Sequence, residues 1–274
     1  MSWWQQLLSW LFKQTCKPVD PRKGPLCFYG PVNHWMLLSD TELDNWMRAC
    51  KDANLAGGSI EMWGNDELGW VTKPHIIKAK YETLILAAQR HGRQLYVTVV
   101  NWNSSTLVNQ GDDWFKQCIG WIKSMGPGNQ IVEPLSEWLG ARNRSADLDA
   151  KANRWNMYAQ EALPAKDWVL GWNKGSRPAS LPSNCAWLDW HSANMNQQGP
   201  TTVAPQHIML STDHSIILAQ MQPGGVKGPC FDPAKVQAWI SQHRPSGRSF
   251  NLYGYYHKAV DYAAIRAAGK AMNG

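Results

Sequence analysis

The segment Gln130-Ile131-Val132-Glu133-Pro134-Leu135-Ser136-Glu137-Trp138 joins an apolar run to an acid and a proline. Ile131 and Val132 are β-branched and predict a short buried strand. We expect the strand to end at Glu133, because an ionised carboxylate suits the mouth of a barrel better than a core, and because Pro134 favours the end or edge of a strand.

Segments of the same kind alternate with helical ones along the chain. Expected strands cover 25–33, 57–65, 94–103, 131–133, 168–173, 186–191, 208–213 and 250–256. Expected helices cover 39–54, 74–91, 112–125, 147–162, 232–243 and 260–272. This alternation indicates an α/β fold with a parallel sheet. Eight strands, with no glycine-rich phosphate motif after the first, predict a single (β/α)₈ TIM-type barrel rather than an open sheet.

The totals agree with one barrel domain. The chain has 274 residues, and such barrels take about 250. We expect residues 25–274 to form the barrel and residues 1–24 to form a short Trp-rich apolar helix with its lead-in. The net charge of +6 suits polyanionic surroundings such as bacterial wall polymers. It is spread without a basic run, so no nucleic-acid partner is expected.

The first twelve residues are apolar and rich in tryptophan. They lack the basic start and small-residue cleavage site of a signal peptide, and they are too short to span a bilayer. Two interpretations stay open for residues 3–12, a helix packed on the barrel or an interfacial anchor that contacts a membrane or a partner. Synthesis in the cytoplasm is expected, with association with an envelope or virion left open.

The six cysteines do not have the spacing of a zinc site. Cys27, Cys50, Cys118 and Cys185 fall in apolar patterns and are predicted to be buried thiols. Cys16 and Cys230 fall in expected loops, and whether they pair is open.

Polar and aromatic side chains mark the ends of the expected strands, where barrel active sites lie. Tryptophan accounts for 17 residues, and flat aromatic rings stack on sugars. The alternative is that a tryptophan packs in the core, which we expect of about half of them. The expected substrate-binding residues are Trp35, Glu61, Trp63, Asn101, Trp102, Trp172, Asn173, Asp189, Trp190, His191, Tyr255 and His257. Histidines at strand ends suggest metal hydrolysis as an alternative, but the His-x-His expected on a first strand is missing. No metal and no cofactor are therefore expected.

Two of the acids are candidates for glycosidic bond cleavage, which needs a proton donor and a second carboxylate that acts as nucleophile or base. Glu133 is the expected proton donor. Asp213, which ends the seventh expected strand, is the expected nucleophile or base, and Glu137 is an alternative to either. Each also has a structural interpretation as a salt-bridge partner or a helix cap.

The layout resembles the clan A glycoside hydrolases, which are (β/α)₈ barrels with an acid/base Glu on the fourth strand and a nucleophile Glu on the seventh. Val132-Glu133-Pro134 is similar to the family's Asn-Glu-Pro, with Val in place of the Asn that contacts the sugar 2-hydroxyl. Asp213 stands where the family has Glu. A shorter acid widens the gap between the carboxyl groups, which favours inversion.

These observations predict a glycoside hydrolase that cleaves a polysaccharide or glycan. Bacterial cell-wall glycan, cut by a phage or bacterial enzyme of lysozyme or endolysin type, is one such substrate. The alternative is a non-catalytic barrel that binds carbohydrate or serves as a structural component of a virion or envelope.

Overall fold

The computed structural model of the chain describes residues 24–31, 34–62, 69–101, 105–126, 128–136, 145–165, 167–173, 185–191, 203–213, 231–254 and 259–274. At positions 105, 172, 173, 191, 212 and 213 the description covers the backbone alone.

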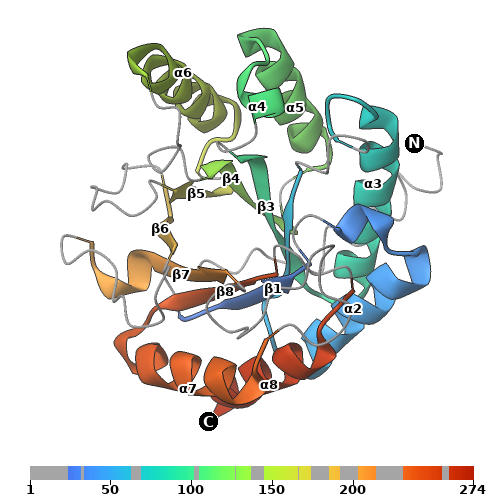
Figure 1. Ribbon diagram of the computed structural model, residues 1–274, viewed down its shortest axis with the longest axis vertical. Coiled ribbons are helices and arrows are strands. Elements are labelled where there is room, and N and C mark those ends of the chain that lie inside the picture. Colours follow the sequence, from blue (N-terminus) through green and yellow to red (C-terminus); the bar gives the residue numbers. More distant parts are fainter. Residues whose placement is uncertain are drawn as a thin grey trace.

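Eight parallel strands close into a barrel in sequence order, as predicted. Helices surround the strands (Figure 1). The strands are β1 (Cys27–Gly30), β2 (Gly57–Glu61), β3 (Gln94–Asn101), β4 (Gln130–Ser136), β5 (Val169–Asn173), β6 (Trp187–His191), β7 (Ile208–Asp213) and β8 (Ser249–Tyr253).

The helices begin where the sequence marks them. They are α2 (Asp40–Asp52), α3 (Pro74–Arg90), α4 (Ser105–Val108), α5 (Asp112–Ser124), α6 (Ala146–Ala162), α7 (Pro233–His243) and α8 (Tyr262–Asn273). Short 3₁₀ turns cover Trp35–Leu37, Pro205–His207 and Arg244–Ser246. Ser39 and Glu42 form a capping box at α2, and Asp232 caps α7 by accepting from the Ala234 N–H at 2.9 Å. The short helix α4 was not predicted.

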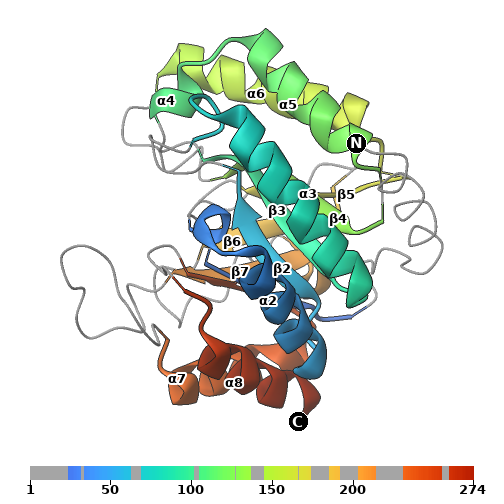
Figure 2. The same cartoon turned by 90° about the vertical axis from the view of Figure 1, so that its right-hand side faces the viewer.

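Two apolar cores hold these elements together. The larger one lies between the strands and the helices and includes Trp46, Trp155 and Trp239, all fully buried. The helices pair at opposite ends of the molecule, α5 with α6 and α7 with α8 (Figure 2). The smaller core lies inside the barrel, where the Tyr96 ring packs 5.8 Å from both Phe28 and Trp187, measured between ring centroids.

The structure tests the predictions for four of the cysteines but not those for the N-terminal segment. Residues 3–12 lie outside the described ranges, so the N-terminal helix and the domain boundary stay predictions. Cys27, Cys50, Cys118 and Cys185 are buried free thiols, as predicted. Cys16 and Cys230 lie outside the described residues. Of the helices that the structure describes, none has the length and apolarity needed to cross a bilayer.

Candidate active site

The strand register sorts the inward-facing residues of the barrel into layers, each built from four alternate strands. The lower of three successive layers contains Phe28, Tyr96, Gly171 and Met209. The next, called the polar layer here, contains Ser59, Glu133, Asp189 and Asn251. The third contains Gly30, Thr98, Ser211 and position 173. The interior therefore changes from largely apolar to polar in a single step.

Glu133 lies in the middle of β4 rather than at its end, which corrects the sequence prediction. The strand continues to Ser136, and it pairs with β3 through Val100–Leu135 and Asn101–Ser136. Its pairs with β5 are at Ile131 and Val132, so Pro134, which has no N–H to donate, follows them. The Glu133 side chain is only 1% exposed, and the Thr98 hydroxyl donates to its Oε2 at 2.6 Å. The acid thus lies below the barrel mouth in a fixed orientation.

Asp189 lies in the same layer as Glu133 and is held by two hydroxyl groups. The Tyr96 hydroxyl donates to Oδ2 at 2.8 Å, and the Ser211 hydroxyl donates to Oδ1 at 2.6 Å. The carboxylate is 1% exposed. Hydrogen bonds to a charged acceptor offset part of the cost of burying it. Hydrogen bonds therefore connect Asp189 to both β3 and β7.

Tyr96 connects the two acids electrostatically. Burial raises the pKa of the Tyr96 phenol well above 10, and the carboxylates of Asp189 and Glu133 raise it further. Both acids are therefore near enough to act on one hydroxyl group. The phenol stays protonated at ordinary pH and keeps its role as donor to Asp189.

Glu61 ends β2, two residues beyond Ser59 on the inward face, and is fully buried. The Asn101 amide donates to its Oε1 at 3.0 Å. The sequence therefore identified two residues that lie together, and their predicted contact with substrate stays a prediction.

Two of the expected sugar-stacking tryptophans belong to the core instead. Trp35 is fully buried, its indole N–H donates to the Glu61 carbonyl oxygen at 2.7 Å, and its ring meets Tyr81 edge to face. Trp190 is in the outer core, because strand alternation that turns Asp189 inward turns its neighbour toward the helices. Neither ring presents a face to the barrel interior.

The remaining predicted residues are placed less fully. Trp172 and Asn173 end β5, His191 ends β6, and Asp213 ends β7 opposite Tyr253 of β8; the description at these four covers the backbone alone. Trp63, Trp102, Glu137, Tyr255 and His257 lie outside the described residues. Their roles stay predictions.

Sequence reasoning missed five residues of this interior, namely Ser59, Tyr96, Thr98, Ser211 and Asn251. Counting back by two from the strand-end acids Glu61 and Asp213 leads to Ser59 and Ser211, so part of this signal was present. Asn251 has no acid on its strand to mark it, and only the register with β1 and β7 shows its layer.

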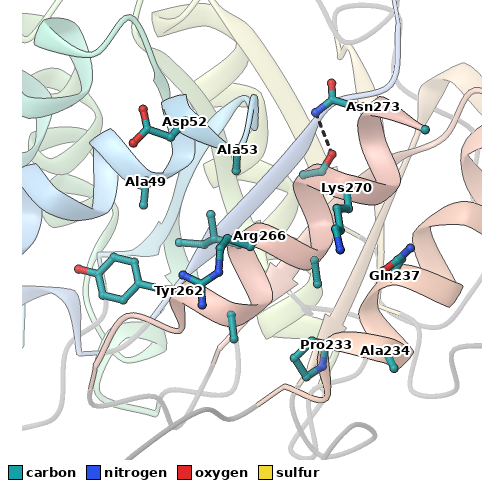
Figure 3. A pocket seen from close by; sticks show the side chains of 15 residues that line it. Ala49, Asp52, Ala53, Pro233, Ala234, Gln237, Tyr262, Arg266, Lys270 and Asn273 are labelled. Atoms are coloured by element: carbon teal, nitrogen blue, oxygen red, sulfur yellow. Dashed lines mark hydrogen bonds between the residues drawn. The ribbon is translucent and has the colours of Figure 1, made fainter.

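A metal-binding cluster or a groove in the helical layer could also hold a ligand. Among the described residues, no group of three or more His, Cys, Asp or Glu side chains is placed to hold a metal ion. A groove of about 1030 Å³ runs along α8 between α2 and α7, lined by Tyr262, Arg266 and Lys270 among others (Figure 3). It lies in the helical layer outside the barrel and includes none of the acids described above.

The fold and this interior define a (β/α)₈ barrel with carboxylates buried in its lumen. Comparison of the sequence with protein-family models and with curated proteins finds no match. Solved structures do match. A family 5 glycoside hydrolase from Bacteroides vulgatus has a TM-score of 0.61 and 12% identity, covering 94% of this chain and 70% of that one.

Two further structures extend the likeness. A GH5_18 protein from Streptomyces cattleya, in complex with GlcNAc, has a TM-score of 0.56 and 10% identity, covering 91% of this chain and 80% of that one. A GH5-4 broad-specificity endoglucanase from Bacteroides salanitronis has a TM-score of 0.52 and 9% identity, covering 94% and 96%. At such identities the likeness shows the fold alone, a (β/α)₈ barrel.

Proposed function

We propose that this protein is a glycoside hydrolase that cleaves a polysaccharide or glycan by means of two carboxyl groups. The observation that carries the proposal is Glu133, a glutamate on β4 that is buried in the barrel lumen and oriented by Thr98. A barrel interior is normally filled by bulky apolar side chains, so an oriented carboxyl group there calls for a chemical role. The fold is one that the named glycoside hydrolases share.

In this mechanism Glu133 donates a proton to the glycosidic oxygen as the bond to the anomeric carbon breaks. Asp213 either attacks that carbon or removes a proton from the water that does. Position 213 is two residues beyond Ser211 on β7, and so lies nearer the mouth than Glu133. This offset and the short aspartate side chain favour a wide gap that admits water, and hence inversion. Proton NMR of the first-formed anomer tests this outcome.

Glu133→Gln is the decisive variant. We expect turnover to fall by about 10²–10⁴-fold, the usual contribution of general acid catalysis. Glu161→Gln, an exposed glutamate on α6, is the matched control and should behave as wild type. Substrates to test are bacterial cell-wall glycan, cellulose and xyloglucan, because the proposed lysozyme-like or endolysin activity is one member of a wider class. Unchanged turnover in Glu133→Gln would rule out the acid assignment.

A non-catalytic carbohydrate-binding or structural barrel is the second candidate. The near-complete enclosure of Glu133 and Asp189 favours it, because substrate must reach acids that are each 1% exposed. Glycan binding by wild type, without cleavage of any substrate in the panel, would decide for this alternative.

Residues 3–12 stay a candidate for membrane or partner contact. Flotation of the full chain with liposomes, compared with a variant that lacks residues 1–15, tests the membrane arm. Equal flotation would reject it.

A further inference from the structure

The polar layer contains two buried side chains that lack hydrogen-bond partners. Asn251 on β8 is 0% exposed, and neither its Oδ1 nor its Nδ2 has a partner among the described residues. Ser59 on β2 is 1% exposed, and its hydroxyl also has none. Leaving such a group unsatisfied in a buried position lowers stability, and folded proteins satisfy most of these groups. Two in one layer indicate a site that something else fills.

The space around them is lined by small residues. Gly30 of β1 stands between β8 and β2 and brings no side chain into the lumen. A Cβ there would collide with the Ser59 carbonyl oxygen, so close backbone contact requires glycine. Ser211 occupies an inward position on β7, and at Gly171 of β5 the Trp187 indole takes the place of a side chain. Barrel interiors are usually filled by Val, Ile and Leu, whereas the residues around this layer are small and polar.

Chemistry limits what can fill the layer. The Asn251 amide needs both a donor and an acceptor, and Ser59 takes either. A phosphate or carboxylate would face Glu133, Asp189 and, two layers higher, Glu61. An ammonium group offers no acceptor for the Asn251 N–H groups. A hydroxyl group donates and accepts at once, so sugar hydroxyls match all four residues of the layer.

The floor limits how a glycan can enter. Below the polar layer, Phe28, Tyr96, Trp187 and Met209 form a packed apolar core, so no chain can pass through the barrel. A sugar that reaches this layer from the mouth must therefore be the last residue of its chain.

We propose that Ser59 and Asn251 form a subsite for the hydroxyl groups of one terminal, uncharged sugar residue, which makes the protein an exo-acting enzyme. This inference rests on the proposed function and narrows its substrate class. It predicts release of short products from one chain end, and discrimination against uronic acids and sugar phosphates despite the positive net charge.

Calorimetric titration with glucose, galactose, mannose and N-acetylglucosamine, and with glucuronic acid and glucose 6-phosphate, tests the subsite. Wild type should bind at least one neutral sugar, and both anions at least tenfold more weakly. Asn251→Ala and, independently, Ser59→Ala should weaken that binding at least tenfold. Asn156→Ala is the matched control, a buried asparagine on α6 whose Oδ1 also lacks a partner, and should leave binding within twofold.

The outcomes separate the subsite from the chemistry. Binding of no neutral sugar, or equal binding by wild type, Asn251→Ala and Ser59→Ala, means that only trapped water fills the layer and overturns the inference. Turnover that depends on Glu133 but yields internal fragments of many lengths also overturns it, while the proposed function stands. Sugar binding lost in Asn251→Ala, with no hydrolysis by wild type, supports the subsite and refutes the enzyme.

Discussion

Two adjacent regions of the barrel interior, separated by about one residue along the strands, differ in chemistry, one apolar and the other polar. The floor around Phe28, Trp187 and Met209 is packed and apolar. The polar layer above it contains two acids and two side chains without partners. Both are buried to nearly the same degree, so burial alone does not distinguish them. Packing fills the floor, although the Trp187 indole N–H also lacks a partner within the described ranges, whereas in the polar layer hydrogen-bonding groups on two strands are left incomplete.

This difference matters because buried apolar groups stabilise the fold, whereas buried polar groups without partners destabilise it. Removing apolar volume from a packed region loses transfer energy and leaves a cavity. Removing a buried polar group that has no partner relieves a cost. Natural sequences keep such costly groups chiefly at functional sites.

The largest effect on stability should come from breaking the floor. Trp187→Ala should lower the free energy of unfolding by about 3–5 kcal/mol, because a buried indole leaves a large cavity. Asn251→Leu, of similar shape to asparagine, should change it by less than about 1 kcal/mol or raise it, because two unpaired groups disappear. Urea unfolding of both variants measures the contrast. Equal losses would mean that the two layers do not differ in this way.

A smaller effect should come from the hydrogen bond that links the floor to the polar layer. Tyr96→Phe removes the hydroxyl group that donates to Asp189 Oδ2 and should cost about 1.5–3 kcal/mol, the range for bonds to charged groups. In an Asp189→Asn background the same change should cost at least about 1 kcal/mol less, because the pair is coupled. Tyr158→Phe on α6 is the control, expected within about 0.5 kcal/mol. Additive losses would show that the bond does not contribute.

The sequence predicted one of these regions much better than the other. Strand and helix positions follow local periodicity, and β7 was predicted at 208–213, where the structure has it. Glu133 was assigned to a strand end because an acid followed by proline usually marks one. Whether Glu133 shares a layer with Asp189 depends on the pairing of distant strands, which no local pattern contains. The predictions for Trp35 and Trp190 were wrong for a different reason, because composition does not tell which side a ring faces, and alternation along β6 turns Trp190 away from the side of Asp189.

Alkaline pH should sharpen the comparison through the buried tyrosines. Burial raises the pKa of the Tyr81 phenol, as it does that of Tyr96, well above 10. The unfolded chain therefore releases these protons from about pH 10 upward while the folded protein keeps them. The stabilisation is complete below that pH and is lost as pH rises toward the raised values, by about 1.4 kcal/mol per unit for each phenol.

Buried thiols act in the same direction, because burial raises the pKa of Cys50, Cys118 and Cys185 to about 12. Urea unfolding between pH 9 and 11 measures the combined slope. Tyr81→Phe should reduce that slope above pH 10 by the share of one phenol. An unchanged slope in this variant would contradict the raised pKa of the Tyr81 phenol.

The smallest effect should come from Trp190, and it separates the structure from the sequence-based prediction most cleanly. If the Trp190 indole stacked on a sugar, replacing it by the smaller phenyl ring would weaken sugar binding. Trp190 instead packs between barrel and helices, and its buried N–H has no partner, so Trp190→Phe removes little and relieves one unpaired donor. Activity, measured as kcat/KM, should stay within about twofold of wild type, whereas Asp189→Asn, one residue earlier on the inward face, should reduce it much further. Alternation along β6 allows only one of two neighbouring residues to face the lumen. Comparable losses in the two variants would therefore contradict the assignment of Trp190 to the outer core.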